Sequence, residues 1–271
     1  MTRRWVLNVA LIVLGLVMMA PFYWMLLTSF LPPELAFRLP PVWFSATLTI
    51  EHFASVFELI PFGLFALNSL KITLIVTTGS LVVSVLAAYA FARLRFRGRD
   101  VLFVILLASL MVPSQVTVVP TFMVLRSLGL VDTHEAVYLP QLINVLAIFL
   151  LRQWFLTIPR DLEDAARIDG AGHFRILRHV IVPLSGPPLA ALAIFISLAA
   201  WNDFFWPNIM LSTPEKLTIP VGLVYLQGEY STGSPVVIFA AISLVVVPIL
   251  VLFVLAQRPI TQSLAMTGLR G

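Results

Sequence analysis

The chain has 271 residues, of which 60% are hydrophobic and only 11% are charged, with a net charge of +4. Soluble domains carry about a quarter charged residues, so this composition excludes an ordinary soluble protein and predicts an integral membrane protein. The absence of cysteine excludes disulfides and thiolate metal sites, and the four histidines lie outside the apolar stretches, which argues against a metal or proton-relay site within the membrane.

Six apolar stretches are long enough to cross the hydrocarbon layer, which takes about 20 helical residues. The first is too long for the apolar part of a cleaved signal peptide, the competing interpretation. A loop over 31–64 follows it, with a short helix expected near 50–59. Pro113 and Pro120 should kink or break the third stretch. The six stretches cover about residues 5–30, 65–92, 101–125, 136–155, 188–211 and 235–256.

The fold class expected from this pattern is an all-α integral membrane protein with six transmembrane helices and both termini cytoplasmic. Cytoplasmic flanks of spans hold most Lys and Arg residues. With the termini inside, 13 of the 17 basic residues lie in the inner segments or at their borders. The basic charge is therefore explained by topology, and no nucleic-acid partner is needed. The arginine cluster over 93–99 fits the same rule, although it could also bind anionic lipid.

A small, charged segment, Glu163 to Gly172 (EDAARIDGAG), interrupts the apolar chain between the fourth and fifth stretches. Asp161 is expected to cap a helix together with Asp164, and Gly170 and Gly172 are natural residues for a left-handed stop. A second amphipathic piece over 173–182 precedes several prolines. The pattern predicts two short helices on the cytoplasmic face, which either dock on another protein or lie in the lipid interface.

The residues of this segment resemble a known family. Asp164-Ala165-Ala166-x-x-x-Gly170, followed by Val180-Ile181-Val182-Pro183, is similar to the EAA loop of binding-protein-dependent ABC importer permeases, with Asp, Val and Val at positions where the family typically has Glu, Ile and Leu. Matches elsewhere resemble the carbohydrate branch, and within it the MalG-type subunit. They are Asn68-Ser69-Leu70, Ala87-Ala88-Tyr89-Ala90-Phe91-Ala92-Arg93, Trp201-Asn202-Asp203-Phe204 and the ending from Gln257-Arg258 to Gly271.

The resemblance implies a single type-1 transmembrane domain over 1–271, with a cytoplasmic coupling loop at 157–186. It implies a permease subunit of a sugar importer in the bacterial inner membrane, not an enzyme, forming half of the translocation pathway. The implied partners are a second permease subunit in a heterodimer, an ATP-binding cassette ATPase dimer, an extracytoplasmic sugar-binding protein, the sugar and the lipid membrane. The implied ATPase-coupling residues are Glu163, Asp164, Ala165, Ala166, Asp169, Gly170, Val180 and Pro183.

The sequence contains no Gly-x-x-x-x-Gly-Lys-Ser/Thr loop, so no cofactor is expected in this chain, and ATP and Mg²⁺ are expected on the partner ATPase. Asp203 is the main candidate for a residue in the pathway, with Asn68 and Asn202 as weaker candidates. An acid at mid-bilayer depth costs on the order of 3 kcal/mol, and such residues are functional by default. Helix packing or a near-surface hydrogen bond is the alternative role. The competing function is a secondary transporter driven by an ion gradient, and an intramembrane enzyme would need a catalytic cluster that these stretches lack.

Overall fold

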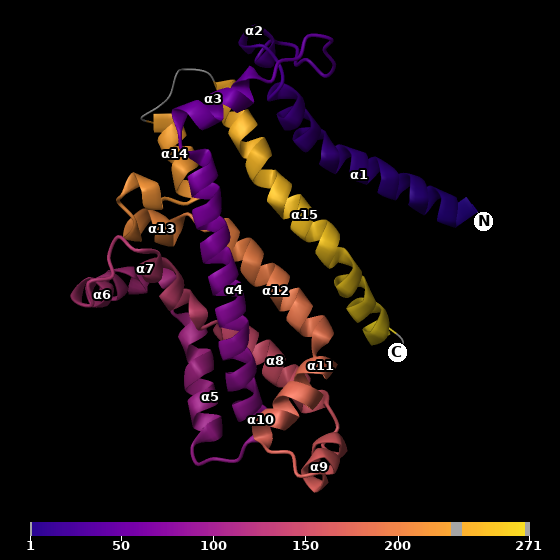
Figure 1. The fold of residues 1–271 in the computed structure, drawn as a ribbon. Coiled ribbons are helices and arrows are strands. Elements are labelled where there is room, and N and C mark those ends of the chain that lie inside the picture. Colours follow the sequence, from indigo (N-terminus) through magenta and orange to yellow (C-terminus); the bar gives the residue numbers. More distant parts are fainter. Residues whose placement is uncertain (1, 229–234, 269–271) are drawn as a thin grey trace. The chain divides into compact units, whose positions relative to one another are not determined.

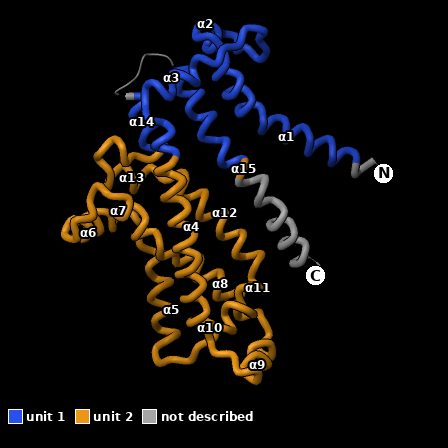
Figure 2. The backbone as a smooth tube through the Cα atoms, in the orientation of Figure 1, with its two compact units in different colours: residues 1–66, 219–250 blue, residues 67–218, 251–271 orange. Residues whose placement is uncertain are grey.

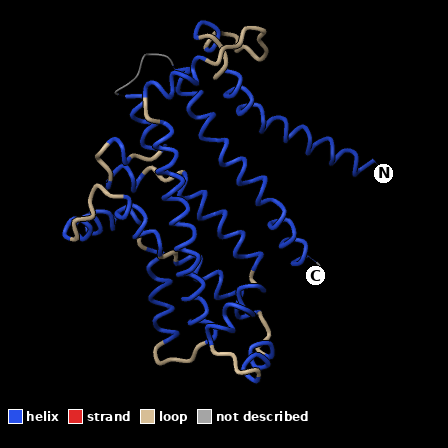
Figure 3. Tube along the Cα trace, in the orientation of Figure 1, coloured by secondary structure: helices blue, strands red, loops and turns tan. Residues whose placement is uncertain are grey.

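The computed structural model describes the backbone of residues 2–228 and 235–268, and the side chains of 5–227 and 235–251. Its described part is helical, with loops and no strand (Figure 3). By its contacts the chain divides into two compact units, 1–66 with 219–250 and 67–218 with 251–271 (Figure 2). The expected match from Gln257 to Gly271 lies outside the described side chains.

The first unit contains α1 (Thr2–Thr28), α2 (Pro33–Ala36), α3 (Glu51–Leu59), α14 (Ile219–Gly228) and the start of α15 (Pro235–Gly268) (Figure 1). Its core joins Leu31 and Ala36 to Val236, and Trp24 packs edge-on against Phe239 with ring centroids 5.7 Å apart. The short helix expected near 50–59 is confirmed as α3. Nε2 of the buried His52 lies 2.9 Å from the carbonyl oxygen of Leu31, within hydrogen-bond distance.

The second unit contains most of α4 (Phe62–Arg93), followed by α5 (Arg99–Ala108), α6 (Ser114–Ser127), α7 (His134–Tyr138) and α8 (Val145–Thr157). The charged segment and the chain after it form α9 (Asp161–Ile168), α10 (His173–Ile176), α11 (Val182–Leu184), α12 (Gly186–Trp201) and α13 (Phe205–Met210). Helix α8 contacts both α5 and α12, and buries Ile148, Leu151 and Phe155. This packing gives the unit its core.

Among the described residues, three helices are long and apolar enough to cross a membrane: Trp5–Thr28, Phe62–Arg93 and the run His134–Thr157. Two bent helix pairs raise this number to five if each pair is one span. The described apolar part of α15, Pro235–Val251, is shorter. The protein is thus an all-helical membrane protein with three to five candidate spans in its described part.

The expected break at Pro113 is confirmed. The third stretch divides into Arg99–Met111 and Ser114–Ser127, which are bent by 104°. Val112 has an extended backbone (φ −90°, ψ 114°), because the ring of Pro113 disfavours helical backbone in the residue before it and Pro113 donates no amide hydrogen. Pro120 remains inside α6.

The fifth stretch ends earlier than expected. Helix α12 stops at Trp201 rather than near Leu211, and a separate short helix, α13, follows. The reason is local, since Asn202 adopts a non-helical backbone (φ −92°, ψ 3°) and its side-chain amide donates to the carbonyl of Leu198 at 2.8 Å. An amide side chain that bonds its own helix end satisfies a free carbonyl and favours termination there.

Candidate functional site

The charged segment from Glu163 to Gly172 and the piece after it fold into the two expected helices, but the first begins differently. Asp161 is the first helical residue of α9 rather than its cap, and Arg160 before it already has helical backbone angles (φ −68°, ψ −27°). A side-chain cap needs an extended backbone at the capping residue, which Asp161 does not have. Its carboxylate lies instead in the first turn with Glu163 and Asp164, where the partial positive charge of the helix terminus favours anions.

The end of α9 confirms the expectation for Gly170. Its φ is +79°, and its amide donates to the carbonyl of Arg167 at 2.9 Å, while the amide of Ala171 donates to that of Ala166 at 2.9 Å. These two bonds form a Schellman motif, in which glycine avoids the steric cost of left-handed backbone. Gly172 does not share this role, because its φ is −76° and it precedes α10. The path of the loop is therefore set by one glycine.

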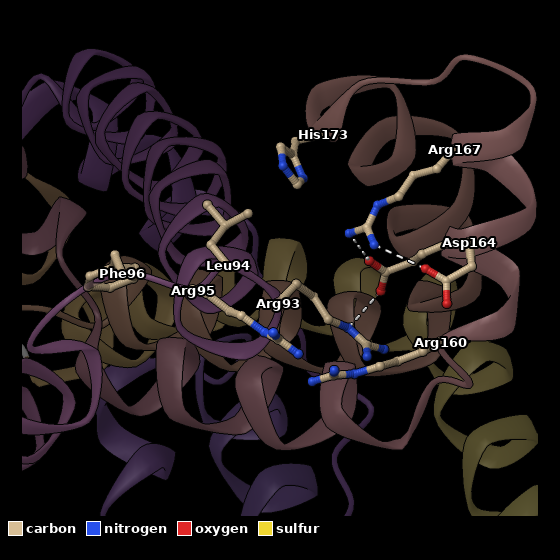
Figure 4. A pocket seen from close by; sticks show the side chains of 9 residues that line it. Arg93, Leu94, Arg95, Phe96, Arg160, Asp164, Arg167 and His173 are labelled. Atoms are coloured by element: carbon tan, nitrogen blue, oxygen red, sulfur yellow. Dashed lines mark hydrogen bonds and ion pairs between the residues drawn. The ribbon is translucent and has the colours of Figure 1, made fainter.

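Glu163 faces inward, contrary to the expectation that it contacts a partner. Its carboxylate lies 2.8 Å from Nε of Arg93, and the two side chains are 4% and 3% exposed (Figure 4). Nη2 of Arg93 also donates to the carbonyls of Phe155 and Ile158 at 2.5 and 2.6 Å. One guanidinium thus joins the end of α4, the end of α8 and the first turn of α9. Burial of such a pair requires these extra partners.

A neighbouring side of α9 is open. A stripe at helical spacing, which we call the outer stripe, consists of Leu162, Ala165, Ala166 and Asp169; all are exposed except the half-buried Ala166. Two large apolar side chains of the segment are also exposed, Ile168 of α9 at 87% and Phe174 of α10 at 69%. Ile168 was missed from the sequence, because the direction in which α9 faces depends on the Arg93–Glu163 pair.

The remaining members of the expected coupling set differ in their surroundings. Asp164 is exposed, and its carboxylate accepts from Arg167 Nη1 at 3.0 Å. Val180 is half-buried in a π-helical turn, Leu177–Ile181, and Pro183 is exposed in α11. The buried residues of that piece are Ile176, Leu177 and Ile181. Val180 and Pro183 therefore lie on the second helix of the segment, away from the outer stripe.

The three expected pathway residues each have separate partners. The buried amide of Asn68 donates to the carbonyls of Glu215 and Leu217, both at 2.9 Å. Asn202 caps α12, as described above. Asp203 accepts from Nε2 of Gln141 at 3.0 Å and from the amide of Trp206 at 3.3 Å. Gln141 was missed from the sequence, where nothing marks it; it also lines a cavity of about 320 Å³ with residues of α12.

A second unpredicted feature, which we call the Asp132 clasp, holds the segment after α13. Asp132 has a positive φ of 62°, and its carboxylate accepts from the amides of Ser212 and Thr213 at 2.9 and 3.0 Å. The Thr213 hydroxyl and Lys216 Nζ bind the same carboxylate at 2.5 and 2.9 Å. These bonds, the Thr213 hydroxyl foremost, hold the pKa of Asp132 well below its usual range.

Comparisons with known proteins identify a family for this chain. Residues 80–265 match the family described as "Binding-protein-dependent transport system inner membrane component". The chain is 33% identical to the arabinooligosaccharides transport system permease protein AraQ of Halalkalibacterium halodurans, over 98% of this chain and 96% of that protein. It is 32% identical to the sn-glycerol-3-phosphate transport system permease protein UgpE of Brucella suis, over 95% and 94% of the two chains.

A third relative is the inner membrane ABC transporter permease protein YcjP of Escherichia coli, with 31% identity over 93% of this chain and 91% of that protein. Among solved structures, a chain of a bacterial ABC transporter involved in the import of the acidic polysaccharide alginate superimposes with a TM-score of 0.82. It covers 93% of this chain and 94% of its own length at 24% identity. At that identity the likeness shows that the two chains share a fold.

Proposed function

Since the chain belongs to the family of inner membrane components of binding-protein-dependent transport systems, which are multi-pass transport proteins rather than enzymes, we propose that it is one permease subunit of an ATP-driven carbohydrate importer. In this proposal residues 1–271 form a single transmembrane domain with half of the translocation pathway. The segment 157–186 couples it to a separate ATPase. The observation that carries the proposal is the fixed and exposed outer stripe of α9.

The outer stripe has the properties of a docking surface. Its two alanines have little side-chain bulk, so another backbone can approach closely. Ile168 and Phe174 of the same segment are exposed at 87% and 69%, and a partner that covers them removes apolar surface from water. The inward Arg93–Glu163 pair and the turn at Gly170 hold the stripe in one orientation, so less conformational freedom is lost on binding. ATP and Mg²⁺ would be bound by the ATPase.

Carbohydrate is the substrate class that the relatives support. AraQ and UgpE are named for arabinooligosaccharides and sn-glycerol-3-phosphate, both polyhydroxylated solutes. We extend that class to this chain, delivered by an extracytoplasmic binding protein to a heterodimer of this subunit and a second permease. The proposed topology has six spans, with α15 as the sixth and both termini cytoplasmic. The distribution of arginine supports it.

Co-purification of the ATPase tests the coupling role. The chain is produced with the neighbouring permease and ATPase genes, and Ala165→Glu is compared with Arg97→Gln, which changes the net charge equally at an exposed position of the α4–α5 turn. We expect Ala165→Glu to lose both the ATPase and sugar-stimulated hydrolysis in liposomes, while Arg97→Gln keeps both. If Ala165→Glu inserts and retains the ATPase at the wild-type level, the outer stripe is not the docking surface.

A further inference from the structure

A cavity of about 690 Å³ lies on the inward side of α9, between this helix, the end of α4 and the turn that leads to α5 (Figure 4). Four arginines line it, Arg93, Arg95, Arg160 and Arg167, together with two carboxylates, Glu163 and Asp164. The outer stripe does not line the cavity, so the docking proposal leaves it unexplained.

The positive charge of this cavity is not balanced by the chain. Glu163 pairs with Arg93 at 2.8 Å, and Asp164 pairs with Arg167 at 3.0 Å. Within the described residues, the guanidinium groups of Arg95 and Arg160 have neither an ion-pair nor a hydrogen-bond partner. Figure 4 shows their guanidinium groups pointing toward each other and toward that of Arg93. Converging like charges repel, and an anion between them removes the repulsion.

A phosphate group fits this arrangement. The planar guanidinium offers paired N–H donors that match phosphate oxygens, and one phosphate can accept from two or three arginines at once. Arg93 adds rigidity, because its side chain is 3% exposed and is held by Glu163 and two carbonyls. The cavity thus combines one fixed guanidinium with two free ones.

The level of the cavity indicates the source of the phosphate. The apolar helix Phe62–Arg93 ends at the cavity, and the next candidate span begins at Arg99, so the turn 94–98 lies at the boundary of the membrane. Leu94 and Phe96 also line the cavity, and Phe96 is 41% exposed. A free anion gains nothing from contact with apolar side chains, whereas the glycerol and first acyl carbons of a phospholipid can pack against them.

We propose that this cavity binds the phosphate of an anionic phospholipid from the cytoplasmic leaflet, through Arg95 and Arg160 beside the fixed Arg93. The inference uses the orientation proposed above but not the contact with the ATPase. The bound lipid links the α4–α5 turn to α9 and so helps to hold the coupling segment at the membrane surface. Anionic headgroups are enriched where such basic clusters occur.

The test measures lipid binding by the full-length protein in nanodiscs and by native mass spectrometry of the purified protein. Phosphatidylglycerol, phosphatidylcholine and inorganic phosphate are compared for wild type, Arg95→Gln/Arg160→Gln and the control Arg97→Gln/Arg178→Gln. Both double variants remove two positive charges, and the control positions are exposed and outside the cavity. We expect the cavity variant to bind phosphatidylglycerol at least about tenfold more weakly, while the control stays close to wild type.

Three results would overturn the proposal. Equal losses in the two variants mean that only surface charge attracts the lipid. Phosphate that competes as well as phosphatidylglycerol means that the cavity takes a free anion. Loss of the ATPase with unchanged lipid binding means that Arg95 and Arg160 hold a carboxylate of that partner. Ala165→Glu should leave lipid binding unchanged, so the two proposals fail separately.

Discussion

Replacing Glu163 with alanine should loosen α9 far more than replacing Asp164, its neighbour in the same turn. Glu163 and Arg93 are 4% and 3% exposed, whereas Asp164 and Arg167 are 61% and 46% exposed. Removing one partner of a buried pair strands the other charge and costs about 3–5 kcal/mol. An exposed pair contributes about 1 kcal/mol or less. Arg93 keeps two carbonyl acceptors, so we expect the lower value, about 3 kcal/mol.

Hydrogen exchange of the α9 amides measures this difference directly. An opening free energy lowered by about 3 kcal/mol corresponds to roughly hundredfold faster exchange, and Asp164→Ala should change the rate by about fivefold at most. Both variants remove one carboxylate from the first turn, so their effects on the helix dipole are matched. Equal rates in the two variants would refute the reasoning, because Glu163 would then not hold α9 in place.

The other predictions concern single positions. Gly170→Ala should lower the free energy of unfolding, measured by thermal unfolding, by about 1–2 kcal/mol, because the φ of Gly170 is +79°. Gly172→Ala should change this free energy little, because the φ of Gly172 is −76°. Equal losses in the two variants would contradict the Schellman turn. Gly222→Ala should lower the melting temperature more than Gly79→Ala. A Cβ at position 222 would lie 2.3 Å from the stiff ring of Phe65, whereas a Cβ at position 79 would lie 2.6 Å from the mobile tip of Leu142. The reverse order of melting temperatures would contradict this packing. Because the pKa of Asp132 is lowered in the folded state, its carboxylate stabilises the protein fully above the unfolded pKa of about 3.9, and this stabilisation is lost as the pH falls. Between about pH 5 and 2 the melting temperature of the wild type should therefore fall more than that of Asp132→Asn. Parallel pH profiles of the two proteins would exclude the clasp.

Local signals predicted the features that depend on neighbouring residues. The break at Pro113 and the left-handed turn at Gly170 follow from what proline and glycine do to their own backbone. The apolar stretches likewise predicted the candidate spans Phe62–Arg93 and His134–Thr157. In each case the physical cause lies within a few residues of its effect, so a single sequence contains it.

Features that depend on distant partners were not predicted. Glu163 was expected to face a partner protein, but Arg93, 70 positions earlier, draws it inward and so decides which side of α9 is exposed. Gln141 was missed because its role depends on Asp203. The expected cap at Asp161 failed for a local reason, since helical backbone at Arg160 leaves no extended residue there.

The Asp132 clasp has a consequence for how the protein can evolve. The side chain of Asp132 accepts from the backbone amide of Ser212, and the side chain of Asn68 donates to the backbone carbonyl of Glu215. Neither bond depends on the side chain of Ser212 or Glu215. The side chains of Ser212 and Glu215 are exposed. Mutation can therefore change the chemistry displayed at these two positions without altering the course of the backbone. A lineage that acquires a new partner at this surface can adjust it one substitution at a time.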